Sequence, residues 1–134
     1  MDDLEGCAED AEGLFKLLSP IWGEEHIKLL MDKEATKAKI HTAIERLASN
    51  ADTNDTVLFY FGGYGSKNGS IAPYDAYYTD TWIISYRLGQ WLSGINSERV
   101  VIILDASYPA SDKLSGSGRV VLASCDTDEN GWTA

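Results

Sequence analysis

The stretch TVLFYFGGYGS, residues 56–66, decides the fold class. Its first part, 56–61, is almost entirely apolar or aromatic. An unbroken apolar run of this length is typical of a β-strand that is covered on both faces. The strand ends in glycines that surround Tyr64. Two more runs of the same kind follow, RVVIILDA at 99–106 and RVVLAS at 119–124, so we expect several buried strands.

Helices are expected between the strands. Three segments carry apolar residues at helical spacing: 4–18, 35–49 and 85–95. We expect the first helix to stop before Pro20, because the residue before a proline avoids the helical conformation. Thr36 and Ser85 precede the other two apolar stripes, and their hydroxyls are suited to capping the first turn of each helix.

A short apolar run, HIKLLMD at 26–32, is bounded by polar residues and predicts a further strand. Helices that alternate with apolar strands indicate an α/β fold with three layers, α/β/α, and a mostly parallel sheet with helices on both faces. Ligands bind such sheets outside the carboxyl ends of the strands. The loops at 62–66 and 107–111 leave two of those ends, and we expect the function there.

Composition narrows the class of partner. The chain has 134 residues, the length of one domain, and a formal net charge of −10. This charge argues against nucleic acid and against an anionic membrane, and it suits a basic peptide or protein partner. No apolar run approaches the roughly 20 residues of a membrane span. The acidic start MDDLEGCAED does not resemble a signal peptide, and two cysteines make no disulfide framework, so we expect a cytoplasmic protein.

Common nucleotide and hydrolase motifs do not fit the loops. The spacing of a P-loop is absent. Gly63 and Gly65 begin a dinucleotide fingerprint, but Asn68 stands where its third glycine belongs. Ser107, in the sequence DASYP, has no flanking glycines and therefore does not form the elbow of a serine hydrolase.

Other reactive side chains give little support for chemistry elsewhere. His26 precedes the expected strand 26–32, and His41 lies on the expected solvated face of a helix. Neither has a histidine or cysteine at the spacing of metal ligands, so we expect no metal site. Cys125 follows a different strand and has no base nearby in the sequence, which argues against its being a nucleophile.

Seven blocks of sequence occur in a characteristic order: LEGCAEDAEGLFKLL, ATKAKIHTAIERLA, DTVLFYFGGYGS, APYDA, LGQWL, VVIILDASYPA and RVVLASCDTDE. In this order they resemble the caspase-like peptidases of clan CD, family C14, most closely the metacaspase and bacterial orthocaspase branch. The resemblance covers nearly the whole chain. It implies a caspase-like fold and an origin among cysteine endopeptidases.

Both catalytic positions depart from the family pattern. The family's Y-S-G-H-G motif places its histidine on Tyr64, and its D-[AS]-C motif places the nucleophilic cysteine on Ser107. A tyrosine has a reference pKa of about 10 and is a donor rather than a base at neutral pH. A serine needs a strong base beside it. We therefore predict an inactive pseudopeptidase. The alternative is a weakly active or altered hydrolase that uses Ser107.

The resemblance also implies a pocket for an arginine or lysine side chain. It assigns this pocket to four residues: Cys7, Asp10, Gly62 and Asp105. Gly62 stands where the family has a serine, so one polar contact is missing. The oxyanion hole of the family corresponds to the backbone N–H groups of Gly65 and Ser107, which survive a change of side chain. We expect the site to bind Arg- or Lys-containing peptides without cutting them.

The resemblance further implies that this single domain, 1–134, lacks the family's first strand and its C-terminal small-subunit region. That strand lies between the equivalents of 26–32 and 56–61, and its absence leaves edges that invite a homodimer or strand complementation by a related chain. A shortened chain, a start at an internal methionine and completion by a partner strand all stay open. No cofactor is expected. Calcium enters by resemblance alone, since neither 111–119 nor 126–129 has the spacing of a calcium loop.

Overall fold

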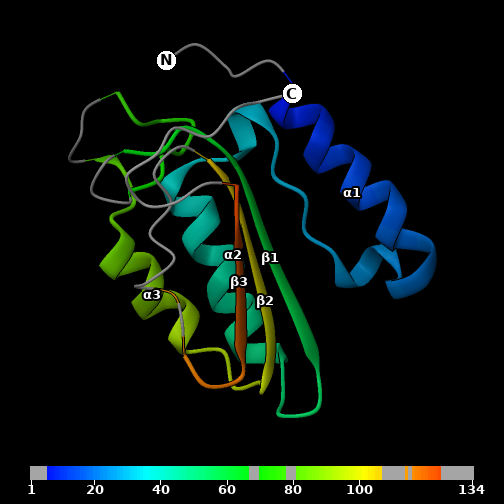
Figure 1. Ribbon diagram of the computed structural model, residues 1–134. Helices are drawn as coiled ribbons and strands as arrows, with labels where there is room; N and C mark the ends of the chain where they lie inside the picture. The colour runs from blue at the N-terminus through cyan, green and yellow to red at the C-terminus, as the bar shows by residue number, and fades with distance from the viewer. Residues whose placement is uncertain (1–5, 67–69, 78–80, 107–113, 115, 125–134) are drawn as a thin grey trace.

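The computed structural model describes residues 6–66, 70–77, 81–106, 114 and 116–124 (Figure 1). Its elements follow one another in this order: α1 (Cys7–Trp22), the 3-10 turns η1 (Glu24–His26) and η2 (Asp32–Glu34), α2 (Lys37–Asn50), β1 (Thr56–Gly63), α3 (Ser85–Ser93), β2 (Arg99–Ala106) and β3 (Arg119–Ala123). None of the helices in these residues is long and apolar enough to cross a membrane.

The sheet is parallel throughout its described strands. Its order is β1-β2-β3, and both pairs of neighbouring strands run in the same direction. The register pairs Val57 with Val100 near one end of β1 and Gly63 with Ala106 at the other. Parallel neighbours need a crossover connection, and α3 lies in the connection between β1 and β2. The expected α/β fold with a parallel sheet is confirmed.

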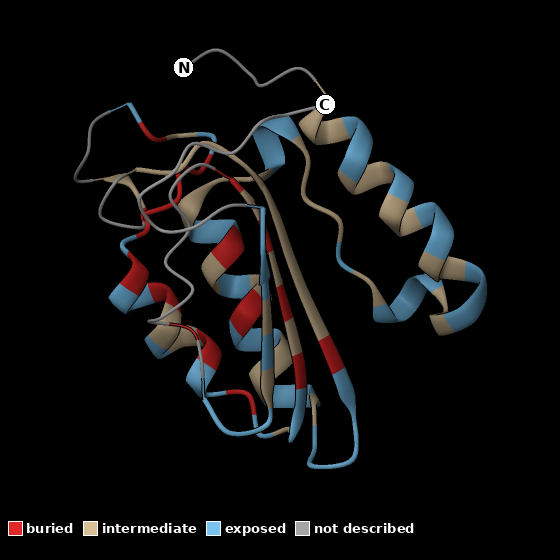
Figure 2. Cartoon of the chain, in the orientation of Figure 1, coloured by how far each residue is buried: buried red, intermediate tan, exposed pale blue. Residues whose placement is uncertain are grey.

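The core lies between the sheet and the helices α2 and α3, which cover one of its faces (Figure 2). Alternate residues of β2 are buried there, and the helices contribute matching apolar side chains: Ile40, Ile44, Leu88, Leu92, Val100, Ile102 and Leu104. Each such side chain stabilises the fold by about 1.5–3 kcal/mol when fully buried. The expected cap of α2 is confirmed, because the Thr36 hydroxyl accepts a hydrogen bond from the Lys39 N–H at 3.3 Å.

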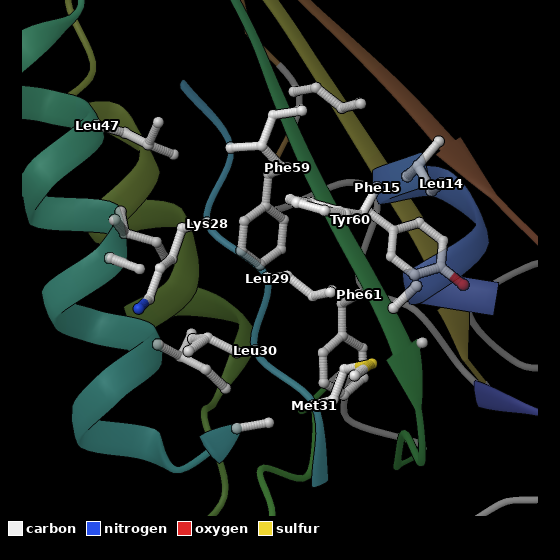
Figure 3. A pocket seen from close by; sticks show the side chains of 18 of the residues that line it. Leu14, Phe15, Lys28, Leu29, Leu30, Met31, Leu47, Phe59, Tyr60 and Phe61 are labelled. Carbon is white, nitrogen blue, oxygen red and sulfur yellow. The ribbon is translucent and has the colours of Figure 1, made fainter. Parts of the chain in front are cut away.

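Helix α1 packs against β1, on the other face of the sheet from α2 (Figures 1 and 3). The same face of β3 is open: Val120 and Leu122 are 55% and 53% exposed. The expectation that 119–124 is covered on both faces was therefore wrong. An apolar sequence predicts a parallel strand, but it does not predict whether a helix covers the second face of that strand.

The predicted end of the first helix was also wrong. Helix α1 continues through Pro20 to Trp22 and closes with a hydrogen bond from the Gly23 N–H to the Ser19 carbonyl at 2.9 Å. A proline in the last turn removes only one N–H donor, and it leaves the rest of the helix intact. The Ser19 hydroxyl adds a bond to the Phe15 carbonyl at 2.6 Å.

Two further local predictions fail. Ser85 is the first residue of α3 rather than its cap; Ile84 has the cap position, and its carbonyl accepts from the Leu88 N–H at 3.0 Å. The segment 26–32 is not a strand. Its middle is extended, but no backbone hydrogen bond between described residues joins it to β1. A strand needs a neighbouring edge, and a cavity separates this segment from β1.

Candidate functional site

The carboxyl ends of β1 and β2 lie side by side and carry several of the predicted site residues. The ladder pairs Gly62 with Asp105 and Gly63 with Ala106. At the same end of the sheet, Ser124 follows β3, and its side chain donates a hydrogen bond to the Ala106 carbonyl of β2 at 3.2 Å. Residues far apart in the sequence thus meet at one sheet edge, as expected for ligand sites of parallel sheets.

The loop after β1 is held by a short antiparallel bridge between Gly65 and Ile71. The Ala72 N–H donates to the Tyr64 carbonyl, and the Ser66 N–H donates to the Ser70 carbonyl, both at 3.0 Å. These bonds flank the bridge, so Gly65 and Ile71 form a pair that shares no hydrogen bond of its own. In such a pair the N–H of each residue points away from the other. The Gly65 N–H is therefore directed away from Ile71.

The segment that holds this loop is anchored to the start of α2. The Tyr74 N–H donates to the Ala35 carbonyl at 2.8 Å. The Asp75 carboxylate accepts from the Lys37 N–H at 2.9 Å. A carboxylate at a helix N-terminus satisfies an unpaired donor and interacts favourably with the helix dipole. Sequence reasoning missed Asp75, because capping motifs are local and Asp75 is distant from α2 along the chain.

The acidic residues of the predicted pocket gather around Tyr60. Burial, together with the charges of Asp105, Asp10 and Cys7, raises the pKa of Tyr60 to about 12. Cys7 and Asp10 come from the first turns of α1, and Asp105 comes from the end of β2. Cys7 and Asp105 are half-buried, whereas Asp10 is exposed. Three predicted pocket residues thus act electrostatically on one phenol.

Tyr60 itself was missed by the sequence reasoning. Side chains alternate along a strand, so Tyr60 shares a face with Gly62, and this spacing was the available signal. The ring points toward α1, where Leu14 and Phe15 lie beside it (Figure 3). The neighbouring side chains Phe59 and Phe61 point to the opposite face, toward the segment 27–31.

A cavity of about 930 Å³ runs along β1. It is lined by the whole strand from Thr56 to Gly63, by the extended segment 27–31 and by parts of α1 and α2. Its walls are mainly apolar, with Phe15, Leu30, Met31, Leu47, Phe59 and Phe61 among them (Figure 3). At the carboxyl end of β1 the cavity reaches Cys7 and Tyr64. It therefore connects an open strand edge to the candidate site.

Four residues considered in the sequence analysis do not contribute to the described part of the site. Ser107 and Cys125 lie outside the described residues. His26 is exposed at the surface, 3.5 Å from a Glu25 oxygen. His41 lies at the surface of α2 as expected, with its side chain 40% exposed and its Nε2 atom 3.0 Å from a Glu45 oxygen. Its ring also stacks on Trp91, with centroids 4.1 Å apart and an interplanar angle of 13°. The apolar face of α3 provides this stacking partner.

A metal site built on acidic, histidine or cysteine side chains needs several of them close together. Among the described residues, no group of three His, Cys, Asp or Glu side chains is placed to hold a metal ion. The acidic segment 126–129 and most of 111–119 lie outside the described part of the chain.

The comparisons with known proteins agree with the geometry. The family model of the caspase domain, Peptidase C14, matches residues 1–130. The chain therefore belongs to the caspase domain family. A comparison with curated proteins finds no match.

Proposed function

We propose that this caspase domain is a pseudopeptidase of metacaspase type that binds an Arg- or Lys-containing segment of a peptide or partner protein without cutting it. The observation that carries the proposal is the gathering of Asp105 and Asp10 at the carboxyl end of β1, where both charges act on the Tyr60 phenol. Acidic side chains that act on the same group favour a nearby cation. The net charge of −10 attracts the same class of ligand from a distance.

The proposed loss of chemistry rests on two side chains. Peptide cleavage in this family needs a nucleophile and a base that removes its proton. Tyr64 follows β1 at the position of the family's histidine, and a phenol is a poor base at neutral pH. Ser107 replaces the thiol, so neither partner starts the reaction. The Gly65 N–H is consistent with the second half of the proposal, because the flanking bonds direct it away from Ile71 and a backbone donor survives a change of side chain.

Calorimetry tests the binding. The probe is the peptide acetyl-Gly-Gly-Arg-amide, and its reference is the same peptide with norleucine in place of arginine. We expect the arginine peptide to bind at least about tenfold more tightly, because hydrogen bonds to charged groups contribute roughly 1.5–3 kcal/mol. Asp105→Asn removes this preference. Glu9→Gln, a matched loss of charge in the same turn of α1 as Asp10, leaves it unchanged. Equal affinity for both peptides contradicts the proposal.

A cleavage assay tests the inactivity. Fluorogenic peptides with arginine or lysine before the reporter group are incubated with the protein, with and without calcium. The expected result is no release of the reporter under either condition. Release that disappears in Ser107→Ala would establish the alternative, a hydrolase that uses this serine.

A second candidate function rests on the cavity along β1. The outer edge of this strand has no partner among the described residues, and apolar side chains line the space beside it. An unpaired edge of this kind accepts an added strand. The occupant we propose is an extended apolar strand of a related chain, with basic flanks that complement the net charge of −10. Light scattering of the protein mixed with such a chain should show a one-to-one complex, and the outer-edge amides of β1 should become protected from hydrogen exchange; a monomer whose outer-edge amides still exchange in the mixture would contradict it.

We place the domain in the cytoplasm as part of the same proposal. The support is the sequence, whose two cysteines make no disulfide framework. Localisation of a tagged chain by microscopy or cell fractionation tests this assignment.

A further inference from the structure

The absence of a side chain at Gly62 has a specific neighbour. A Cβ atom at this position would lie 2.8 Å from the Tyr60 hydroxyl oxygen and 3.4 Å from the ring atoms Cε1 and Cζ. Tyr60 and Gly62 are two residues apart on one strand and share a face of the sheet. The phenol therefore leans over Gly62, and its hydroxyl occupies space that a side chain at position 62 would fill.

The surroundings of this hydroxyl are acidic. Asp105 is the register partner of Gly62 on β2, so its side chain starts from the neighbouring strand at the same level. Asp10 and Cys7 approach from α1, and their charges act on the phenol together with that of Asp105. Burial and these charges keep the hydroxyl protonated well above neutral pH. It is thus a neutral group that both donates and accepts hydrogen bonds among acidic ones.

We propose that the Tyr60 hydroxyl is a specificity-determining group of the pocket for the basic side chain. It supplies, from position 60, the hydroxyl that a serine at position 62 would provide. This inference rests on the proposed binding of a basic segment. The hydroxyl oxygen accepts a hydrogen bond from the guanidinium or ammonium group of the ligand. Its proton is donated to a carboxylate of the pocket, so the phenol joins the cation to the acid. The ring adds an aromatic surface on which a guanidinium can stack.

A cycle of three variants tests whether a serine hydroxyl at position 62 can replace the Tyr60 hydroxyl. The variants are Tyr60→Phe, Gly62→Ser and the double change, and the probes are the arginine and norleucine peptides used above. Tyr60→Phe removes one hydrogen bond to a charged group and should weaken binding of the arginine peptide about tenfold. The norleucine peptide should bind as before. The change keeps the ring and its packing, so loss of fold does not account for the result.

Gly62→Ser alone forces the new side chain against the Tyr60 oxygen and should also weaken binding of the arginine peptide. In the double variant the oxygen is gone, and the nearest ring atoms lie at ordinary contact distance. The serine hydroxyl should then restore the affinity to within about threefold of the wild type, since both hydroxyls make the same kind of bond. Tyr60→Phe with unchanged affinity, or a double variant no better than Tyr60→Phe, overturns the inference.

A titration without peptide separates this inference from the proposed function. Tyrosinate absorbance is followed as the pH rises. Tyr60→Phe should remove the phase near pH 12, and Asp105→Asn should move that phase to lower pH. If this holds but the wild type shows no preference for arginine, the basic-segment function is refuted, and the role of Tyr60 in recognition with it. A preference for arginine that survives Tyr60→Phe refutes the inference alone.

Discussion

Asp75 should stabilise the domain from a position far from α2 in the sequence. Its carboxylate accepts a hydrogen bond from the Lys37 N–H, the first amide of α2, at 2.9 Å. The segment that carries Asp75 also holds the loop after β1, through the bond from the Ala72 N–H to the Tyr64 carbonyl. Asp75→Ala therefore removes one of the two hydrogen bonds that tie this segment to the start of α2, and it leaves the bond from the Tyr74 N–H to the Ala35 carbonyl.

The size of this effect can be worked from the contact. Loss of a side-chain acceptor at a helix N-terminus costs about 1 kcal/mol, and loss of a favourable charge there adds roughly 0.3–1 kcal/mol. The free energy of unfolding should fall by about 1.5 kcal/mol in Asp75→Ala. For a domain of this length, that corresponds to a decrease in Tm of roughly 6 °C. Asp75→Asn keeps an oxygen acceptor and should lose about half as much.

Thermal unfolding followed by circular dichroism measures the decrease in Tm, and hydrogen exchange locates it. The amides of Lys37 and Ala72 should exchange faster in Asp75→Ala, because their partners are removed or loosened. Glu24→Ala is the matched control, since it removes the same charge from an exposed 3-10 turn. A Tm of Asp75→Ala within about 1 °C of the control would show that Asp75 does not stabilise the domain in this way.

Three further predictions follow from single contacts. Because the pKa of Tyr60 is raised from 10.0 to about 12, its contribution to stability is complete below pH 10 and is lost between pH 10 and 12; two pKa units equal about 2.7 kcal/mol, which screening of a half-exposed phenol reduces to about 1 kcal/mol. Urea titrations across this range should show that loss in the wild type and not in Tyr60→Phe. Gly118→Ala should lower the free energy of unfolding by more than about 1 kcal/mol, as its φ is +75° and a Cβ would lie 2.8 Å from the Glu98 carbonyl oxygen; an unchanged urea midpoint would contradict this. Trp91→Ala should cost about 2 kcal/mol through lost burial and lost stacking on His41, and Trp91→Phe, the control, should cost less by the same measurement.

The sequence was sufficient for the elements whose local signals agree with their packing. The apolar runs at 56–61 and 99–106 became neighbouring strands, and Thr36 caps α2 as its hydroxyl predicts. The segment 26–32 failed for a physical reason. Its residues favour an extended backbone, and its backbone is extended. Formation of a strand also needs hydrogen bonds to a neighbouring strand edge, and the edge of β1 lies across a cavity. Local propensity does not contain that information.

The sequence likewise predicted some parts of the candidate site and not others. The carboxyl ends of β1 and β2 were predicted from topology, and the register confirms that Gly62 and Asp105 are neighbours. Tyr60 could not be singled out, because its position over Gly62 and between acidic groups depends on α1 packing against β1. The hydrogen bond of Asp75 with α2 likewise joins residues that are distant in the sequence, so no local pattern predicts it.

We propose that this caspase domain keeps a pocket for a basic side chain and lacks only the side chains that cut the peptide bond. The double variant Tyr64→His with Ser107→Cys tests it most directly, in a cleavage assay with fluorogenic arginine and lysine peptides. We expect no cleavage by the wild type and little by either single variant, since members of a catalytic unit depend on one another. The double variant should show measurable cleavage after basic residues. Cleavage by the wild type, or a folded double variant that cuts no basic peptide, would contradict it.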